Sequence, residues 1–346
     1  MQRPDLRSVG SFGKPTWRRL LSAVVSGLLA CGPAGEAVSG GVTAGRVEYI
    51  MGTMLDIRVE ALDHSTAARA VDTAFAVVNQ LDSLLSNYKP DSDLSRLVAA
   101  APEPVAVGGL TFEFVQRTLA LAKQTDGAFD PTIGSAVALW GFYSGDYRIP
   151  DTLELRSVMA TVGYQHVRLD ESARTVALDS GVQFDPGGTG KGFALEQAIA
   201  RLQTMELISV YFDFGGQVYR SGADTIGIAV QHPRDDSLTV SEIYFSAGSV
   251  ATSGDYERFF DHDGSRYSHI LDGRTGQPVP NRYSVSVYAP DPWTADALST
   301  VLYVLGPDQS TALLKHFPGA GALYILNDAD AWVVGADSVW RTLESR

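Results

Sequence analysis

Cysteine is nearly absent from this chain, which has one such residue among its 346. An intramolecular disulfide and a cysteine-based zinc site both need more than one cysteine, so the sequence excludes both. Basic residues are also scarce, with 27 Lys and Arg against 40 Asp and Glu and a formal net charge of −13. Binding to nucleic acid requires a basic surface, so no nucleic acid is expected as a partner.

Long hydrophobic runs are missing beyond the N-terminus. No stretch after residue 31 approaches the roughly eighteen apolar residues of a membrane-spanning helix, so no transmembrane helix is expected. Hydrophobic residues nevertheless make up 45% of the chain and charged residues only 19%. This composition provides a sizeable core and is not that of a disordered protein. The length allows one large domain or a few smaller ones.

The first 31 residues have the pattern of a bacterial lipoprotein signal peptide. Three basic residues, Lys14, Arg18 and Arg19, precede an eleven-residue apolar run at 20–30 that is too short to span a bilayer comfortably. The run ends directly before Cys31, in a sequence that resembles a lipobox, after which the cysteine becomes the lipidated first residue of the mature protein. An ordinary signal peptide that happens to contain a cysteine is the alternative.

Lipidation would explain how a strongly acidic protein stays at a membrane. Removal of residues 1–30, which include five basic residues and one acidic residue, leaves a net charge of −17. An anionic lipid surface repels such a protein, so an N-terminal lipid anchor would be what holds it there. We therefore expect the protein on the periplasmic side of the bacterial cell envelope, attached to either the inner or the outer membrane.

Composition divides the chain into three segments. Residues 1–31 form the predicted signal peptide, and residues 32–45, rich in glycine and other small residues, are predicted to be a flexible tether. Residues 46–346 contain no Pro/Ser-rich linker and are predicted to form the folded part.

The folded part mixes hairpins with helices, which predicts an α+β fold rather than a regular βαβ repeat. Residues 47–61 are predicted to form one or two strands broken at Gly52. Helices are predicted at 65–85, with Ser65 as the N-cap, and at 111–124, 191–204 and 294–305; strands at 207–214, 225–231, 240–247 and 283–289; and a hairpin at 164–179.

A glycine-rich segment from Asp185 to Gly192 lies immediately ahead of a predicted helix. Backbone N–H groups in such a turn can approach an anion, and a helix N-terminus favours negative charge. Lys191 would add a positive charge for a phosphate. The segment has neither the Walker A spacing nor a GxGxxG fingerprint, which argues against a P-loop NTPase and a Rossmann domain. A purely structural glycine turn is the alternative.

Asp296 and Thr300 are four residues apart in a predicted helix and therefore share one face of it. Their carboxylate and hydroxyl oxygens are hard ligands that suit Mg²⁺. The alternative is that Asp296 lies in the first helical turn and only interacts with the helix dipole.

Together these segments resemble the FAD:protein FMN transferases, the ApbE-type flavin transferases. The resemblance extends from about residue 47 to about residue 306, and seven blocks occur in the order of that family. The blocks are Met51-Gly52-Thr53; 88–96; 127–132 with 139–142; 185–192; 252–256; His269 to Asp272 with 274–276; and 296–300.

The resemblance implies an α+β fold with mixed or antiparallel sheets flanked by helices. It also implies an enzyme that uses FAD and Mg²⁺ to move the FMN moiety onto a threonine, or sometimes serine, hydroxyl of an acceptor protein in the envelope, releasing AMP. Matching positions assign FAD binding to Met51, Tyr88, Ala128, Phe129, Asp130, Asp185, Lys191 and Ile270. They assign Mg²⁺ binding to the carbonyl of Gly188 with Asp296 and Thr300, and catalysis to Asp296 and to His269 as a base for the acceptor hydroxyl.

Four residues depart from the pattern of the family that the chain resembles. Pro186 stands where an aliphatic residue is usual, Thr189-Gly190 where Ile-Ala is usual, and Gly273 where proline is usual. They spare the expected ligands and bear on the stiffness of the loops. Two other functions remain compatible with the sequence. One is an FAD pyrophosphatase, in which water replaces the acceptor hydroxyl and FMN and AMP are released. The other is a flavin-binding lipoprotein without turnover, against which the Asp296/Thr300 pair argues.

Overall fold

The computed structural model describes residues 40–280, 283–326, 331–336 and 339–342. The predicted signal peptide with Cys31, and the predicted tether up to residue 39, lie outside the described residues. No helix in the described part of the chain is both long enough and apolar enough to cross a membrane.

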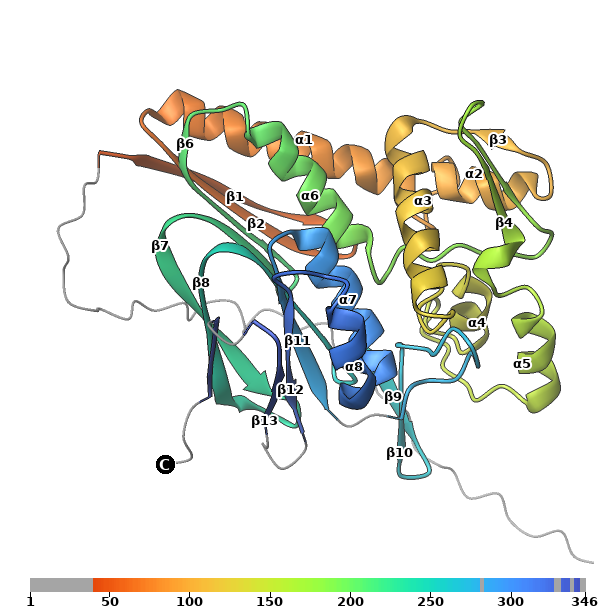
Figure 1. Cartoon of the computed structure of the whole chain (residues 1–346). Coiled ribbons are helices and arrows are strands. Elements are labelled where there is room, and N and C mark those ends of the chain that lie inside the picture. Colours follow the sequence, from red (N-terminus) through yellow and green to blue (C-terminus); the bar gives the residue numbers. More distant parts are fainter. Residues whose placement is uncertain (1–39, 281–282, 327–330, 337–338, 343–346) are drawn as a thin grey trace, which may run out of the picture. The chain divides into compact units, whose positions relative to one another are not determined.

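Within the described residues, nine strands form one large sheet in which every pairing is antiparallel (Figure 1). The order is β1-β2-β6-β7-β8-β11-β12-β13, with β14 paired to β8. The strands are β1 (Val42–Ile50), β2 (Thr53–Ala61), β6 (Leu207–Phe214), β7 (Gln217–His232), β8 (Asp235–Gly254), β11 (Ser284–Ala289), β12 (Gly321–Ile325), β13 (Ala331–Val334) and β14 (Trp340–Thr342).

The β1–β2 hairpin corrects the expected start of the folded part. β1 begins at Val42 and pairs with β2 along its whole length, so residues 42–45 belong to the sheet and not to a flexible tether ending at residue 45. The break at Gly52 is confirmed. Met51 and Gly52 have φ values of 47° and 81°, and positive φ at both central residues is the signature of a tight two-residue hairpin turn.

Helix α6 packs against both α1 and α7, and the three helices cover one face of the large sheet (Figure 1). Phe75 of α1, Phe212 of β6 and Leu298 of α7 are fully buried in the core between them. The helices of the described chain are α1 (His64–Leu85), α2 (Asp93–Ala100), α3 (Gly109–Gln124), α4 (Gly134–Leu139), α5 (Thr152–Met159), α6 (Gly190–Leu202), α7 (Pro292–Leu305) and α8 (Pro307–Leu314).

The N-cap of α1 is Asp63, so the prediction of Ser65 as the cap is wrong. The Asp63 carboxylate accepts a hydrogen bond from the backbone N–H of Thr66 at 2.9 Å. Ser65 instead donates its hydroxyl to Asp63 at 2.7 Å. A carboxylate placed just ahead of the first turn satisfies free N–H groups at the helix start.

A smaller three-stranded sheet, β3-β5-β4, lies with α2 to α5 beside the large sheet (Figure 1). Its strands are β3 (Val105–Ala106), β4 (Val167–Asp170) and β5 (Thr175–Leu178), and the 3₁₀ turn η1 (Tyr164–His166) precedes β4. The hairpin predicted at 164–179 is therefore confirmed. A separate two-stranded hairpin, β9 (Phe259–His262) and β10 (Ser265–Ser268), follows β8.

Candidate active site

A cavity of about 750 Å³ opens where the β1–β2 turn, the glycine-rich turn before α6, the start of α7 and the loop after β10 meet. Every residue predicted to bind FAD or metal lines this cavity, as does the predicted base. They are Met51, Tyr88, Ala128, Phe129, Asp130, Asp185, Gly188, Lys191, His269, Ile270, Asp296 and Thr300.

The N-terminal ends of α6 and α7 touch at Gly192. A Cβ atom on Gly192 would lie 2.5 Å from the carbonyl oxygen of Pro292 and 2.6 Å from Cβ of Asp296, so only glycine allows this approach. The backbone N–H of Gly192 donates a hydrogen bond to Oδ2 of Asp296 at 2.8 Å. The Lys191 ammonium lies 3.6 Å from the other carboxylate oxygen of Asp296, Oδ1.

Asp296 is a buried carboxylate, only 4% exposed. Burial raises the pKa of Asp296, while the Lys191 charge and the Gly192 N–H oppose the rise. A carboxylate in such surroundings gains from a nearby cation, because an opposite charge favours its ionised form. Its position therefore suits a metal ligand better than a group that only interacts with the helix dipole.

The other two predicted metal ligands lie next to each other. A Cβ atom on Gly188 would lie 3.2 Å from Oγ1 of Thr300 and 3.2 Å from the Phe129 ring. Thr300 is one turn after Asp296 in α7, so both side chains lie on the face of α7 that lines the cavity. Within the described residues, no group of three or more His, Cys, Asp or Glu side chains could hold a metal ion. A metal here would bind to one carboxylate and neutral oxygens.

Asp185 is held by a partner that no sequence motif indicated. The Tyr143 hydroxyl donates to Oδ2 of Asp185 at 2.9 Å, and the N–H of Gly187 donates to Oδ1 at 2.6 Å. Burial raises the pKa of Asp185, and these two hydrogen bonds and the charge of Arg258 oppose the rise. The Tyr143 ring in turn packs edge-on against the exposed ring of Tyr88, with centroids 5.8 Å apart.

His269 is fixed in one tautomer by its backbone neighbour. Its Nδ1 lies 3.1 Å from the carbonyl oxygen of Arg258, which can only accept, so Nδ1 has the proton and Nε2 has the free lone pair. Burial, together with the charges of Arg258 and Lys191, lowers the pKa of His269 to about 4, against the opposing effect of that hydrogen bond. The imidazole is therefore neutral at pH 7 and able to accept a proton at Nε2.

The carboxylate of Asp130 faces other parts of the protein. Its Oδ1 accepts from the N–H and the hydroxyl of Thr132 at 2.9 and 2.6 Å, and its Oδ2 accepts from the N–H of Tyr164 at 2.7 Å. Asp130 lines the cavity, but both of its oxygens tie two loops together. Its side chain therefore stabilises the cavity wall.

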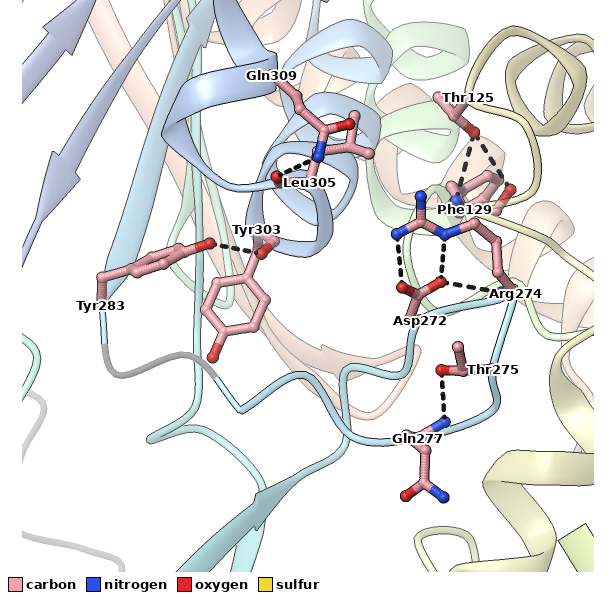
Figure 2. Close-up of polar contacts among 10 residues, drawn as sticks. All are labelled: Thr125, Phe129, Asp272, Arg274, Thr275, Gln277, Tyr283, Tyr303, Leu305 and Gln309. Atoms are coloured by element: carbon pink, nitrogen blue, oxygen red, sulfur yellow. Dashed lines mark hydrogen bonds and ion pairs between the residues drawn. The ribbon is translucent and has the colours of Figure 1, made fainter.

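The loop after Ile270 closes over the segment that contains Ala128. Asp272 pairs with Arg274, and Figure 2 shows this pair beside Thr125 and Phe129. Gly273 lies between Asp272 and Arg274 in the chain, and its N–H donates a hydrogen bond to the carbonyl of Ala128 at 3.1 Å. A Cβ atom on residue 273 would lie 2.3 Å from the carbonyl oxygen of Gly127. Glycine at 273 thus provides a hydrogen bond that proline cannot donate.

Gln217, at the start of β7, is a second cavity residue that the sequence did not indicate. It is 2% exposed, and its Nε2 donates to the carbonyl of Pro292 at 2.7 Å. Its Oε1 has no hydrogen-bond partner within the described part of the chain. A buried amide oxygen without a partner is costly, so this atom is suited to accept a hydrogen bond from a bound molecule or water.

Comparisons with known proteins agree with this architecture. The model of the ApbE family matches residues 51–324. The FAD:protein FMN transferase of Treponema pallidum (strain Nichols) is 33% identical over 331 residues, covering 87% of this chain and 91% of the relative. A crystal structure of the ApbE protein from Thermotoga maritima has a TM-score of 0.78 at 30% identity, covering 86% of this chain and 98% of that chain.

A structure of the flavin transferase ApbE from Vibrio cholerae, in a mutant with a histidine replaced by glycine, has a TM-score of 0.74 at 28% identity. It covers 86% of this chain and 99% of that chain. These solved structures share the arrangement of helices and antiparallel sheet described above. By its sequence and by its fold, the chain belongs to the ApbE family.

Proposed function

We propose that this chain is a Mg²⁺-dependent transferase that moves the FMN moiety of FAD onto a threonine or serine hydroxyl of an acceptor protein and releases AMP. The observation that supports this most directly is the meeting of Asp296, Thr300 and Gly188 beside Lys191 in the cavity that His269 also lines. The name of the T. pallidum relative, FAD:protein FMN transferase, describes the same reaction.

The cavity suits FAD in both size and chemistry. Its volume of about 750 Å³ lies within the usual range for small-molecule sites. Apolar and aromatic side chains such as Met51, Phe129 and Tyr88 offer contacts for a flavin ring system. The turn before α6 and the Lys191 ammonium offer N–H groups and positive charge for the diphosphate.

The donor set also fits Mg²⁺. The ion prefers hard oxygen ligands and is usually bound through one or two carboxylates together with substrate phosphates and water. Asp296 would supply the carboxylate, with the Thr300 hydroxyl and the Gly188 carbonyl as neutral oxygens. When bound, Mg²⁺ would supply charge neutralisation at the phosphate oxygens of the substrate.

The remaining chemistry belongs to the protein. His269 Nε2 accepts the proton of the acceptor hydroxyl, whose oxygen forms a new bond to the FMN phosphorus. The bond between that phosphorus and the bridging oxygen breaks, and AMP departs with the bridging oxygen and its electron pair. Lys191, held beside Asp296, is placed to neutralise negative charge on the phosphates.

A single incubation distinguishes this function from its two alternatives. The purified protein is mixed with FAD, Mg²⁺ and envelope proteins from cells that lack this chain, and AMP and protein-bound flavin are measured. We expect equimolar AMP and flavinylated protein, with the mass of FMN on a threonine or serine. AMP with free FMN and no labelled protein would instead identify an FAD pyrophosphatase. Bound FAD that yields neither product would identify a flavin-binding protein without turnover.

We also propose that the protein is a lipoprotein on the periplasmic side of the cell envelope, where its acceptor would lie. The support is the position of Cys31, the only cysteine, directly after the apolar run at 20–30. The net charge of −17 after removal of residues 1–30 makes attachment to an anionic membrane dependent on lipid.

Cys31→Ser is therefore expected to move the protein from the membrane fraction to a soluble or unprocessed form. Lipid attachment requires the thiol, which serine lacks. Cell fractionation and the intact mass of the mature protein are the measurements, and a substitution at Ser39 in the predicted tether serves as the control. Unchanged fractionation together with an unchanged mature mass would show that Cys31 is not lipidated.

A further inference from the structure

Arg258 is a cavity residue to which neither the sequence patterns nor the proposed mechanism gives a role. It follows the end of β8 and directly precedes β9, and it lines the cavity together with His269 and Asp185. Its side chain is exposed, and in the part of the chain that the structure describes its guanidinium makes no hydrogen bond or ion pair, although the chain is rich in carboxylates. A solvated arginine inside a cavity is available to a ligand.

The backbone of Arg258 is fixed from both sides. Three residues earlier, the buried carboxylate of Asp255 forms a bidentate pair with Arg234 at 2.7 and 2.8 Å. On the other side, the carbonyl of Arg258 accepts from the backbone N–H of His269 at 3.0 Å and lies 3.1 Å from its Nδ1. The backbone of the arginine is therefore tied directly to the proposed base.

The β9–β10 hairpin, which lies in the chain between these two anchors, is itself braced by stacked aromatic rings. Phe260 of β9 stacks on Tyr267 of β10 with centroids 5.1 Å apart, and on Tyr147 at 5.3 Å. Tyr267 also stacks on the buried Trp140 at 5.7 Å. Such packing stabilises the hairpin that links Arg258 to His269.

The two cations whose charges lower the pKa of His269 differ in how far they are already neutralised. Lys191 lies 3.6 Å from the Asp296 carboxylate, which offsets part of its charge. The charge of Arg258 instead acts on cavity groups from a distance, lowering the pKa of both Asp185 and His269. Arg258 thus combines an exposed side chain that lines the cavity with a positive charge that acts on the groups around it.

We propose that the guanidinium of Arg258 binds the diphosphate of FAD next to His269 and holds the FMN phosphoryl group during transfer. This proposal rests on the proposed function, since it takes FAD as the substrate. A guanidinium offers planar paired donors that match the oxygens of a phosphate, and it adds the positive charge that a doubly charged diphosphate needs beyond Lys191. The isoalloxazine and adenine rings have no negative group that would compete for it.

The test compares ligands with and without phosphate. Arg258→Met keeps an unbranched but shorter side chain and leaves in place the backbone carbonyl that faces His269, while it removes the charge. Dissociation constants for FAD and for riboflavin are measured by flavin fluorescence in EDTA, where no transfer occurs. We expect Arg258→Met to weaken FAD binding by about ten- to a hundredfold, as for a lost charge-assisted hydrogen bond, and riboflavin binding by less than about twofold. The dissociation constant of Arg258→Lys for FAD should lie between those of Arg258→Met and the wild type.

Arg266→Met provides the matched control. Arg266 lies on the same hairpin, but its guanidinium contacts Asp261 and the Phe259 ring instead of the cavity. Its replacement should leave both dissociation constants unchanged. Unchanged FAD affinity in Arg258→Met, or an equal loss for FAD and riboflavin, would overturn the proposal. Because the measurement needs no turnover, a wild type that binds FAD without transferring FMN would refute the proposed function and still test Arg258.

Discussion

Asp296→Ala is expected to lower the rate of FMN transfer by about a hundredfold or more, since each ~1.4 kcal/mol of lost transition-state stabilisation is a factor of ten. Asp296 is the one carboxylate of the proposed metal site, and Gly188 and Thr300 would contribute only neutral oxygens. Without it, little charge remains to hold Mg²⁺ at the diphosphate. Release of AMP at saturating FAD and acceptor is the measurement.

A second variant separates the charge of Asp296 from its structural hydrogen bond. Asp296→Asn keeps an oxygen that can accept from the N–H of Gly192, which the wild-type carboxylate does at 2.8 Å, but it has no negative charge. If the carboxylate acts through the metal, the asparagine variant loses as much activity as alanine while its melting temperature stays close to that of the wild type. High activity in Asp296→Asn, or full wild-type activity in EDTA, would contradict the metal site.

Thr300 and pH provide graded versions of the same test. Thr300→Ala should lower transfer activity less than Asp296→Ala does, because a neutral hydroxyl stabilises less charge than a carboxylate. Added Mg²⁺ should restore part of the activity of Thr300→Ala.

Burial raises the pKa of Asp296, so its carboxylate is protonated at a higher pH than an exposed one. The apparent affinity for Mg²⁺ should therefore fall as pH decreases, beginning above the pH range where exposed carboxylates titrate, and titrations of Mg²⁺ at several pH values would detect this.

Local patterns in the sequence were enough to predict those elements whose signal is short and periodic. The strand at 207–214 coincides with β6, because alternating side chains face the core and Gly215-Gly216 ends the strand in a turn. The segments predicted as strands at 225–231 and 240–247 are only parts of β7 and β8. Residues 217–222 of β7 are all buried or half-buried and residues 248–254 of β8 nearly all buried, whereas the start of β8 is exposed, so no alternation of buried and exposed side chains marks the ends of these strands.

The short helices escaped prediction because they contain too few turns to show a period. α4 has six residues and α2 has eight. α5 is also short, but Asp151 and Glu154 form a capping box at its N-terminus, and this signature could have indicated its start. Caps are therefore a better sequence signal than periodicity for helices of this length.

The cavity residues were predictable where one motif holds several ligands, as at 185–192 and 296–300. Contacts between distant segments were not. Tyr143 reaches Asp185 across 42 positions, and Asp130 reaches Tyr164 across 34. Nothing in the local sequence distinguishes a tyrosine that orients a carboxylate from one that fills the core, so such partners require the fold.

His269→Ala is expected to lower kcat for FMN transfer by about a hundredfold, the lower range for loss of a general base. Phosphoryl transfer with a loose transition state needs little help in removing the nucleophile's proton, which limits the effect. The neutral imidazole with Nδ1 on the Arg258 carbonyl leaves Nε2 as the proton acceptor. A pKa of about 4 means that this nitrogen is unprotonated at pH 7 and is lost as a base when the pH approaches 4.

His269→Asn is the variant that decides whether the base or its hydrogen bond matters. The asparagine amide can still donate to the Arg258 carbonyl, as Nδ1 does, but it has no basic nitrogen. We expect it to bind FAD as the wild type does and to lose transfer as fully as His269→Ala. The acid limb of kcat/KM should also change, because in the free enzyme that limb includes protonation of His269. An asparagine variant that keeps both the rate and the acid limb would show that His269 only anchors the hairpin, since its hydrogen bond would then account for its whole contribution.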